Sequence, residues 1–362
     1  MKLTFITQNE APFRMRWMDE LAKYIDVQVF HIGEYENDIN MAYIDYHTCR
    51  AVTQKNALKF FKWNIFDIRK IKESKYSVLL LDGYGFTAQQ ILMIWLILTK
   101  QPYGLTVDGG FIPLKEGIIK RNVKKFFISH ADFWFSTGEY TDKLLTYYGA
   151  KEKRIHRHYF SNVLQKDIID RPLSKEEKRL LRQSLKLDGK FIFIAVGRLI
   201  PRKGFDILSK ALDMMDEECT VLIIGGAVNG CENENLKYNK KIRCLPFMGK
   251  EKLKEYYQAS DVFVMPTRYD IWGLVVGEAM ANGLPVITTD RCLAGIQMVK
   301  EEKNGYIVPT EDPEMLSEKM LSIMHKDTYK MGAVSLREMQ NYSIESSAKN
   351  DIEFIKNLSE NY

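Results

Sequence analysis

The stretch that decides the fold reads Pro266-Thr267-Arg268-Tyr269-Asp270-Ile271-Trp272-Gly273-Leu274-Val275-Val276-Gly277-Glu278-Ala279-Met280-Ala281-Asn282-Gly283-Leu284-Pro285-Val286-Ile287. It follows an apolar run, and we expect a helix from about Gly273 to Gly283, because glycine readily adopts the left-handed conformation that closes a helix. The N–H groups at the start of such a helix form a natural phosphate site. A strand, a helix and the next strand, Pro285–Thr288, are typical of a parallel α/β sheet.

The same alternation extends in both directions and occurs in two series, separated by the polar region 167–178. Near-continuous apolar strands between helices indicate parallel sheets covered on both faces. We therefore expect two doubly wound Rossmann-like α/β domains, residues 1–170 and 171–342, which face a central cleft at the carboxyl ends of their strands. Residues 343–362 are expected to form a C-terminal helix that packs back towards the first domain. The expected strands are Lys2–Thr7, Asp26–His31, Ser77–Leu81, Gly104–Val107, Phe133–Ser136, Phe191–Val196, Thr220–Ile224, Val262–Met265, Pro285–Thr288 and Tyr306–Val308.

The composition excludes several classes of protein. With 362 residues, 46% of them hydrophobic and 27% charged, the chain is neither disordered nor a simple coiled coil. Its five cysteines are scattered and form no CxxC pair, which argues against a disulfide framework and a zinc site and favours a reducing cytoplasm. The longest apolar run, Ile91 to Leu98, is far short of the ~20 residues that a spanning helix needs. We therefore expect a cytoplasmic protein.

The excess positive charge lies in the first half of the chain. Residues 1–172 carry 25 basic and 19 acidic side chains, whereas the remainder carries 27 and 28. This excess favours an anionic surface or ligand for the first domain and is too small to indicate nucleic acid as a partner.

A basic cluster follows the first strand of the second series. That strand ends at Gly197, and Arg198, Arg202 and Lys203 come within the next six residues. Arginine can hold phosphate oxygens in a bidentate manner and lysine supplies a compact charge, so the cluster suits a diphosphate. A solvated basic loop is the alternative. The position at a strand's carboxyl end favours the diphosphate.

Glu278 is a carboxylate among apolar neighbours. It shares a helical stripe with Leu274 and Ala281, where an ionised group is costly unless it is hydrogen-bonded. Sugar hydroxyls are suitable donors. Pairing with an internal arginine or a backbone group is an equally good interpretation.

These motifs together resemble one family. Gly197-Arg198-Leu199, Lys203-Gly204 and a carboxylate eight residues before Glu278-Ala279-Met280-Ala281 are similar to the family 4 retaining glycosyltransferases of the GT-B fold, of the type that builds bacterial surface polysaccharides. The resemblance covers most of the second domain, and the first domain matches mainly in layout.

The resemblance implies a donor site and a reaction. Arg198 and Lys203 would hold the diphosphate of a nucleotide sugar, Glu278 would bind the ribose hydroxyls, and Asp270 would face the donor sugar. The transfer would retain the anomeric configuration and use no metal or other cofactor, with the cations stabilising the departing diphosphate. No plausible Asp-x-Asp metal motif occurs. Further contacts to sugar and phosphate are implied for Gly197, Trp272, Gly273, Leu274 and Val275.

Two departures from the family pattern concern the donor sugar and the acceptor. The first carboxylate of the family's Glu-x7-Glu pair is Asp270 here, which shortens its reach by about 1.5 Å. The first loop lacks glycine, and Arg14 and Arg16 are expected either to meet an acceptor phosphate or to be two exposed helix residues. Asp108 lies near the place where relatives carry a histidine. It is expected either to orient or deprotonate an acceptor hydroxyl, or to belong to a plain turn.

A basic amphipathic segment runs from Lys115 to Ile128. Ile119, Val123, Phe126 and Phe127 recur at helical spacing beside a basic stripe. Such a helix either lies in an anionic lipid interface or packs its apolar face on the core. A second basic segment runs from Lys55 to Lys75, and two such segments favour the inner face of the cell membrane. The basic stripe consists of Lys120, Arg121, Lys124 and Lys125.

The sequence therefore predicts a retaining glycosyltransferase that transfers sugar from a nucleotide diphosphate to a lipid-linked glycan. A non-catalytic GT-B partner of another transferase and a nucleotide-sugar epimerase are the alternatives. The former is favoured by the altered carboxylate Asp270, and the latter would need no acceptor.

Overall fold

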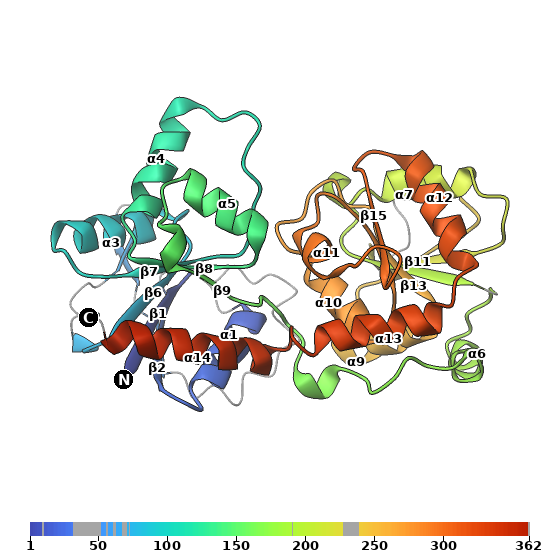
Figure 1. Ribbon diagram of the computed structural model, residues 1–362, viewed down its shortest axis with the longest axis horizontal. Coiled ribbons are helices and arrows are strands. Elements are labelled where there is room, and N and C mark those ends of the chain that lie inside the picture. The colour runs from blue at the N-terminus through green and yellow to red at the C-terminus, as the bar shows by residue number, and fades with distance from the viewer. Residues whose placement is uncertain are drawn as a thin grey trace. The chain divides into compact units, whose positions relative to one another are not determined.

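The computed structural model describes residues 1–8, 11–31, 52–55, 57–60, 63–66, 71, 73–189, 191–226 and 239–360. The chain forms two compact units, Met1–Asn162 with Ser343–Tyr362 (the first unit) and Val163–Tyr342 (the second unit) (Figure 1). The expected boundary after residue 170 is wrong by eight residues. Residues 163–170 join the second unit, where the Ile169 N–H donates to the Ala281 carbonyl at 3.0 Å and Asp167 pairs with Lys250.

The first unit is built on a seven-stranded parallel sheet with the strand order β3-β2-β1-β6-β7-β8-β9. An antiparallel pair, β4 and β5, stands apart from it. Residues 57–60 and 63–66 of the basic segment from Lys55 to Lys75 therefore form paired strands, and the side chains of residues 55–70 lie outside the described residues. The strands are β1 (Lys2–Thr7), β2 (Asp26–His31), β3 (Val52–Lys55), β4 (Ala57–Phe60), β5 (Trp63–Phe66), β6 (Val78–Asp82), β7 (Gly104–Val107), β8 (Phe133–Ser136) and β9 (Ile155–Arg157).

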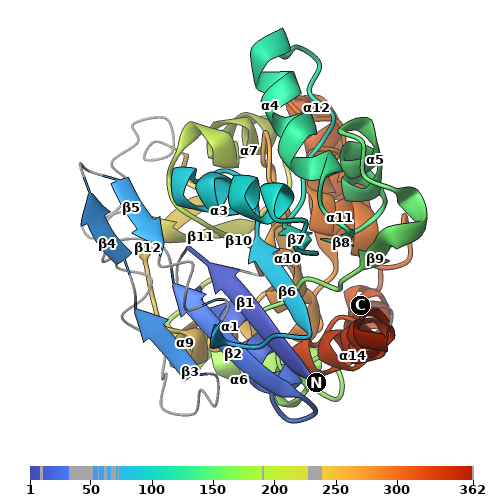
Figure 2. The same cartoon turned by 90° about the vertical axis from the view of Figure 1, so that its left-hand side faces the viewer.

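Helices cover both faces of this sheet (Figures 1 and 2). Leucine, methionine and aromatic side chains of α3, α4 and α5 form one buried core with the strands. On the opposite face, Trp17 of α1 and Phe354 of α14 pack edge to face on Phe135. The sheet is thus buried on both sides, which explains its near-continuous apolar strands. The helices are α1 (Pro12–Leu21), α3 (Thr87–Leu98), α4 (Ile118–Ser129), α5 (Glu139–Tyr147) and α14 (Ile344–Glu360).

The second unit has a six-stranded parallel sheet with the order β12-β11-β10-β13-β14-β15. Helices α7 and α12 bury one face of the sheet. The elements are α6 (Lys175–Ser184), β10 (Ile192–Val196), α7 (Phe205–Asp213), β11 (Thr220–Gly226), β12 (Ile242–Pro246), α9 (Lys250–Ala259), β13 (Val262–Met265), α10 (Leu274–Ala281), β14 (Val286–Thr289), α11 (Leu293–Met298), β15 (Gly305–Val308), α12 (Pro313–Met324) and α13 (Thr328–Met339).

The sulfur chemistry differs in one point from the sequence-based expectation. Cys219 and Cys292 are buried free thiols, but Cys244 is disulfide-bonded. No helix in the described part of the chain combines the length and apolar character needed to cross a bilayer.

A buried ion cluster fastens α6 to the second unit. The Asp261 carboxylate accepts hydrogen bonds from the Ile192 N–H at 2.8 Å and Arg182 Nη2 at 2.6 Å, and it lies 3.3 Å from Lys178 Nζ. Burial lowers the pKa of Lys178, against the attraction of Asp261. The single carboxylate of Asp261 therefore compensates the charge of two cations, Lys178 and Arg182.

Replacing that carboxylate should destabilise the second unit. We expect Asp261→Asn to lower the free energy of unfolding by about 3 kcal/mol, because breaking a buried pair leaves uncompensated charge. The midpoint of urea unfolding measures this effect. Glu176→Gln, which breaks an exposed pair with Arg179 on the same helix, is the control and should change little. Equal midpoints for the two variants would contradict the prediction.

Candidate functional site

The order of strands in the second unit creates a crevice. On one side of β10 lie β11 and β12, and on the other side lie β13, β14 and β15. Chain connections leave β10 and β13 in opposite directions, and the loops at the carboxyl ends of such strands are where open α/β sheets bind ligands. Gly204 lets these loops touch. It has φ = 68°, and a Cβ there would lie 1.9 Å from the Pro266 carbonyl oxygen.

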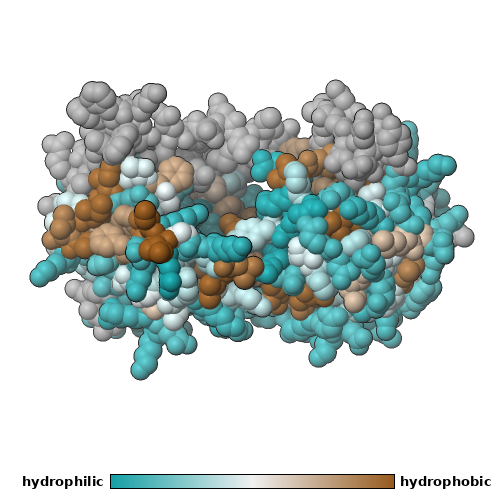
Figure 3. All heavy atoms as spheres, turned by 90° about the horizontal axis from the view of Figure 1, so that it is seen from above, coloured by the Kyte–Doolittle hydropathy of each residue, from teal (hydrophilic) through white to brown (hydrophobic). Residues whose placement is uncertain are grey.

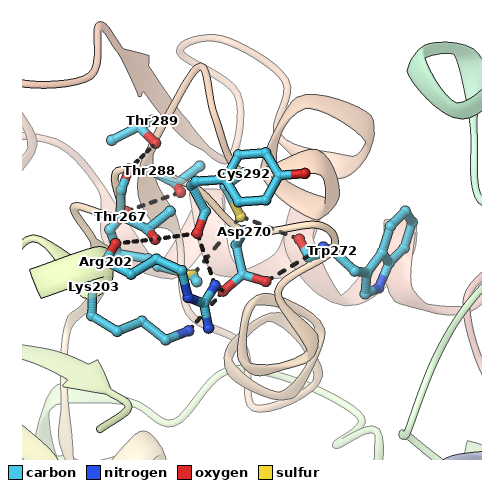
Figure 4. A network of polar contacts seen from close by, with 10 residues as sticks. Arg202, Lys203, Thr267, Asp270, Trp272, Thr288, Thr289 and Cys292 are labelled. Atoms are coloured by element: carbon cyan, nitrogen blue, oxygen red, sulfur yellow. Dashed lines mark hydrogen bonds and ion pairs between the residues drawn. The ribbon is translucent and has the colours of Figure 1, made fainter. Parts of the chain in front are cut away.

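Asp270 occupies this crevice together with two cations (Figure 4). Its Oδ2 lies 2.7 Å from Lys203 Nζ and 3.1 Å from Arg202 Nη1. The carboxylate is 11% exposed, so the ion pairs are largely shielded from water. The structure thus brings together the predicted Lys203 and Asp270. It adds Arg202, which the expected donor-site residues omitted although it is the third cation of the quoted cluster.

The two loops are joined by further hydrogen bonds. The buried Thr267 hydroxyl donates to the Arg202 carbonyl at 2.9 Å, and the Arg268 N–H donates to the same oxygen at 2.9 Å. From the next strand, the Thr289 hydroxyl donates to the Thr267 carbonyl at 2.7 Å (Figure 4). These bonds fix Arg202, Lys203 and Asp270 before any ligand arrives, which is the preorganisation that electrostatic catalysis needs.

The helix after Asp270 begins as expected. Gly273 is its N-cap with φ = 102°, and a Cβ at this position would lie 2.8 Å from Cys292 Sγ. Leu274 and Val275 form the first turn, whose N–H groups have no acceptor within the helix. The Trp272 indole is buried and points away from the Asp270 carboxylate (Figure 4). The Trp272 N–H donates to Asp270 Oδ1 at 3.4 Å, and the Trp272 carbonyl accepts a hydrogen bond from the Ala294 N–H at 2.8 Å.

Glu278 lies one turn further along α10, on the same face as Leu274. Its carboxylate accepts a hydrogen bond from the Tyr257 hydroxyl at 3.1 Å. Burial, and then the charge of Glu278, raises the pKa of Tyr257 well above its ordinary value, so this hydroxyl remains a donor. The structure thus pairs Glu278 with a tyrosine of α9.

Arg198 and Gly197 lie where β10 ends. The Arg198 side chain is exposed and forms no ion pair with any residue in the described ranges. The stem of Lys203 packs over Gly197, where a Cβ would come within 3.3 Å of Lys203 Cε. The loop after β10 carries three cations, Arg198, Arg202 and Lys203, and two of them share the single carboxylate of Asp270. This loop therefore carries an excess of positive charge.

The first unit has a second crevice of the same kind, between β1 and β6, where its strand order also reverses. Arg14 of α1 is buried there and pairs with both Asp82, at the end of β6, and Asp108, just after β7. The burial of Arg14 contradicts the alternative that it is an exposed helix residue. Arg16 is half-buried and does not join the cluster.

Burial and the neighbouring charges shift the pKa of Asp82. Burial raises the pKa of Asp82 to about 6, Asp108 adds to the rise, and Arg14 opposes it. The Thr7 hydroxyl donates to the Asp82 carboxylate at 2.6 Å. One guanidinium therefore serves two carboxylates.

A small pocket of about 20 Å³ lies beside this cluster, within the first unit. Arg14, Asp108 and His158 supply its charged and polar wall. The sequence analysis missed His158, because no local pattern marks it. The aromatic side chains of the wall are Phe13, Trp17, Phe135, Tyr159 and Phe160.

The apolar stripe of helix α4 is only partly buried. Phe127 is buried, but Ile118 and Ile119 are 78% and 82% exposed, and Leu114 just before the helix is 92% exposed. Hydrophobic surface gathers over α3 and α4 next to hydrophilic surface (Figure 3). Lys120, Arg121 and Lys125 are exposed, whereas Lys124 pairs with Glu116 at 2.7 Å. The apolar stripe is thus divided between core and surface.

Metal ligation has little support within the described ranges. No three or more histidine, cysteine, aspartate or glutamate side chains there are arranged to hold an ion.

The Arg14 cluster gives a test by titration. We expect Arg14→Gln to raise the pKa of Asp82 above about 6, because the charge that opposes protonation is removed. Since the folded pKa already exceeds the unfolded one, the stability that Asp82 contributes is complete at low pH and is lost as the pH rises through 6. Carboxyl carbon NMR measures the titration. Arg16→Gln is the control, and an unchanged Asp82 midpoint in Arg14→Gln would contradict the ion pair.

Most of the second unit matches a known protein family. Residues 176–346, slightly less than half of the chain, match the family model of the glycosyl transferases group 1. Over 91% of its length the chain is 25% identical to an uncharacterized glycosyltransferase of Methanocaldococcus jannaschii, of which the match covers 89%. It is 30% identical to a D-inositol 3-phosphate glycosyltransferase of Xylanimonas cellulosilytica over 49% of this chain and 45% of that relative.

Among solved structures, the chain resembles Anabaena HepE in complex with UDP, with a TM-score of 0.79 and 15% identity over 99% of this chain and 100% of that one. At this identity the likeness shows the fold. The matched region contains both halves of the crevice, from Gly197 to Glu278. Residues 176–346 therefore form a glycosyl transferases group 1 domain in a chain of the GT-B fold, and the comparisons support a glycosyltransferase.

Proposed function

We propose that this protein is a retaining, metal-independent glycosyltransferase that moves a sugar from a nucleotide-diphosphate donor to a lipid-linked glycan at the inner face of the cell membrane, in surface polysaccharide synthesis. The observation that carries the proposal is the cluster of Lys203, Arg202 and Asp270 at the crevice of the second unit. It presents fixed cations beside the first turn of a helix, which is the arrangement that binds a diphosphate.

The donor would bind by exchange of partners within this cluster. Lys203 and Arg202 now neutralise Asp270, and an arriving diphosphate gives them a second anion. Asp270 is then released in part to accept hydrogen bonds from sugar hydroxyls. As the bond between sugar and phosphate breaks, negative charge grows on the diphosphate, and cations already in place stabilise it without reorganisation. The UDP complex of the Anabaena structure supports a nucleotide at a fold of this kind.

Glu278 and Tyr257 would bind the nucleoside. The carboxylate of Glu278 already accepts one hydrogen bond from Tyr257. Glu278 lies on the same face of α10 as Leu274, one turn beyond the start of the helix. A carboxylate held in this way can accept hydrogen bonds from two adjacent hydroxyls. We therefore assign it to the ribose, and we assign the phosphates to the start of the helix.

The acceptor would bind to the first unit. Asp108 is paired with Arg14, so its carboxylate is a fixed hydrogen-bond acceptor. We therefore assign Asp108 to orienting an acceptor hydroxyl rather than deprotonating it. The net negative charge of Arg14, Asp82 and Asp108 argues against a phosphate at this point, so a lipid phosphate of the acceptor would lie elsewhere.

The exposed face of α4 supports the membrane part of the proposal. Leu114, Ile118 and Ile119 are large apolar side chains with most of their surface in water. Lys120, Arg121 and Lys125 lie among them in sequence and are also exposed. Apolar groups that enter the acyl boundary and cations that meet anionic headgroups are the two features of an interfacial helix.

Removal of Lys203 tests the donor site. We expect Lys203→Ala to abolish the rise in melting temperature that a nucleoside diphosphate gives the wild-type protein, and to lower nucleotide-sugar turnover by about 100-fold or more, because transition-state charge loses its partner. Glu278→Ala should also abolish transfer. A panel of nucleoside diphosphates and their sugars in a thermal-shift assay identifies the nucleotide.

Lys210→Ala is the matched control, since this lysine is exposed on α7 and lies outside the cluster. Circular dichroism should show an unchanged fold in all three variants. Wild-type turnover in Lys203→Ala would refute the donor site, and isomerised nucleotide sugar without acceptor would indicate an epimerase instead.

Vesicle binding tests the membrane face. We expect the full chain to sediment with vesicles that contain phosphatidylglycerol, and the double variant Ile118→Asp with Ile119→Asp to remain in solution. Each of Lys120→Gln, Arg121→Gln and Lys125→Gln should weaken binding roughly fivefold at ~1 kcal/mol per charge. Leu180→Asp, an exposed position on α6 of the second unit, is the control. Equal sedimentation of all variants would exclude α4 as the contact.

A further inference from the structure

Arg268 lies in the loop between β13 and α10, two residues before Asp270, and its side chain joins three segments of the second unit. Its Nη1 and Nη2 donate to the two carboxylate oxygens of Asp206, at the start of α7, at 2.8 Å each. Nη1 also donates to the Pro201 carbonyl at 2.6 Å. Nε and Nη2 donate to the Glu311 carboxylate, the latter at 3.2 Å. These five hydrogen bonds match the five N–H donors of a guanidinium.

The contacts of Arg268 are firmer than those of an ordinary surface ion pair. The Arg268 and Asp206 side chains are only 28% and 31% exposed, and a bidentate pair within a network stabilises more than a single exposed pair. The hydrogen bond from Arg268 lowers the pKa of Asp206 below its ordinary value, so this carboxylate is ionised at neutral pH. Glu311 has φ = 65°, a left-handed conformation that residues with a Cβ rarely adopt. The strained backbone of Glu311 thus supplies the second carboxylate of the network.

Two bonds of Arg268 hold the short 3₁₀ turn that carries the donor-site cations. Its side chain binds the Pro201 carbonyl, and its backbone N–H donates to the Arg202 carbonyl at 2.9 Å. The next residue is Lys203, whose Nζ lies 2.7 Å from Asp270 Oδ2. Because two successive carbonyls are fixed, the directions in which the Arg202 and Lys203 side chains leave the backbone are fixed too. Ordering a long side chain costs conformational entropy, and a fixed backbone reduces that cost.

We infer that Arg268 is a positioning residue of the donor site, and that its guanidinium holds the turn of Arg202 and Lys203 in the geometry that receives the diphosphate of the donor. Asp206 and Glu311 compensate the charge of Arg268, so this residue acts through the turn and not as a ligand of the diphosphate. The inference rests on the proposed function only for the ligand, because the order of the turn can be measured in the free protein.

The first experiment measures the order of the turn in the full chain without ligand. The Gly204 N–H donates to the Pro201 carbonyl at 3.1 Å, so hydrogen exchange of this amide reports on the turn. We expect Arg268→Gln to speed exchange in residues 198–204 about tenfold, because local opening controls exchange. Mass spectrometry of peptic fragments measures it, and a fragment from β11 should be unchanged. Unchanged exchange in the turn, or an equal rise in β11, would overturn the inference.

Two further variants separate the guanidinium fork from charge and from general packing. Arg268→Lys keeps the charge but replaces a planar fork by a point charge, so we expect exchange in the turn to remain about threefold faster than in the wild-type protein. Arg243→Gln is the matched control, because this exposed arginine of β12 also donates to a backbone carbonyl, that of Lys186, at 2.9 Å. It should leave the turn unchanged. Wild-type exchange in Arg268→Lys would show that charge alone acts and would overturn the inference, and this variant decides if Arg268→Gln does not fold.

A binding experiment links the turn to the ligand. UDP, GDP and ADP are added to the wild-type protein, and the nucleotide that raises the melting temperature most is titrated by calorimetry. We expect Arg268→Gln, at a temperature where circular dichroism shows it to be folded, to raise the Kd about tenfold through lost preorganisation, and Arg243→Gln to keep the wild-type Kd. An unchanged Kd in Arg268→Gln would overturn the link to the donor site. If none of the three nucleotides bound to the wild-type protein, the proposed function would fail, and the exchange data would still decide whether Arg268 orders the turn.

Discussion

The ion pairs of Asp270 are the constraint on which the candidate site depends. A carboxylate shielded from water must be compensated, and here Lys203 and Arg202 supply the charge from the neighbouring strand's loop. That pairing requires the loops after β10 and β13 to touch, which Gly204 and the hydroxyl of Thr267 make possible. The crevice therefore carries fixed cations whose present partner can be exchanged for a ligand.

The two units use the same architecture with opposite electrostatics. Each sheet reverses its strand order beside its first strand, and each crevice collects charged side chains at the carboxyl ends. In the second unit two cations surround one carboxylate, whereas in the first unit Arg14 serves two. The charged cluster of the first unit thus has an excess of carboxylates, and that of the second unit has an excess of cations. This division suits a reaction that joins an anionic donor to a carbohydrate acceptor.

The C-terminal helix contributes more than packing. Asp351 orders His158, His156 and Trp17 around one buried charge, and so links α14 to α1 and to the segment after β9. A buried carboxylate with several donors is costly to separate from them. The geometry of the first unit's pocket therefore depends on a residue close to the end of the chain.

The sequence by itself determined the α/β class, most strand positions and the cluster of Gly197, Lys203 and Asp270, because these follow from local apolar patterns and from residue types at strand ends. It did not reveal the edge strands β9 and β12, whose partly exposed residues lack an apolar run. Only the tertiary structure decided which groups are paired. The Arg202 contact to Asp270, the Tyr257 contact to Glu278 and the His158 contact to Asp351 join residues 68, 21 and 193 positions apart. The exposure of α4 is also a tertiary result, since periodicity places an apolar stripe on a helix but does not say whether core or solvent faces it.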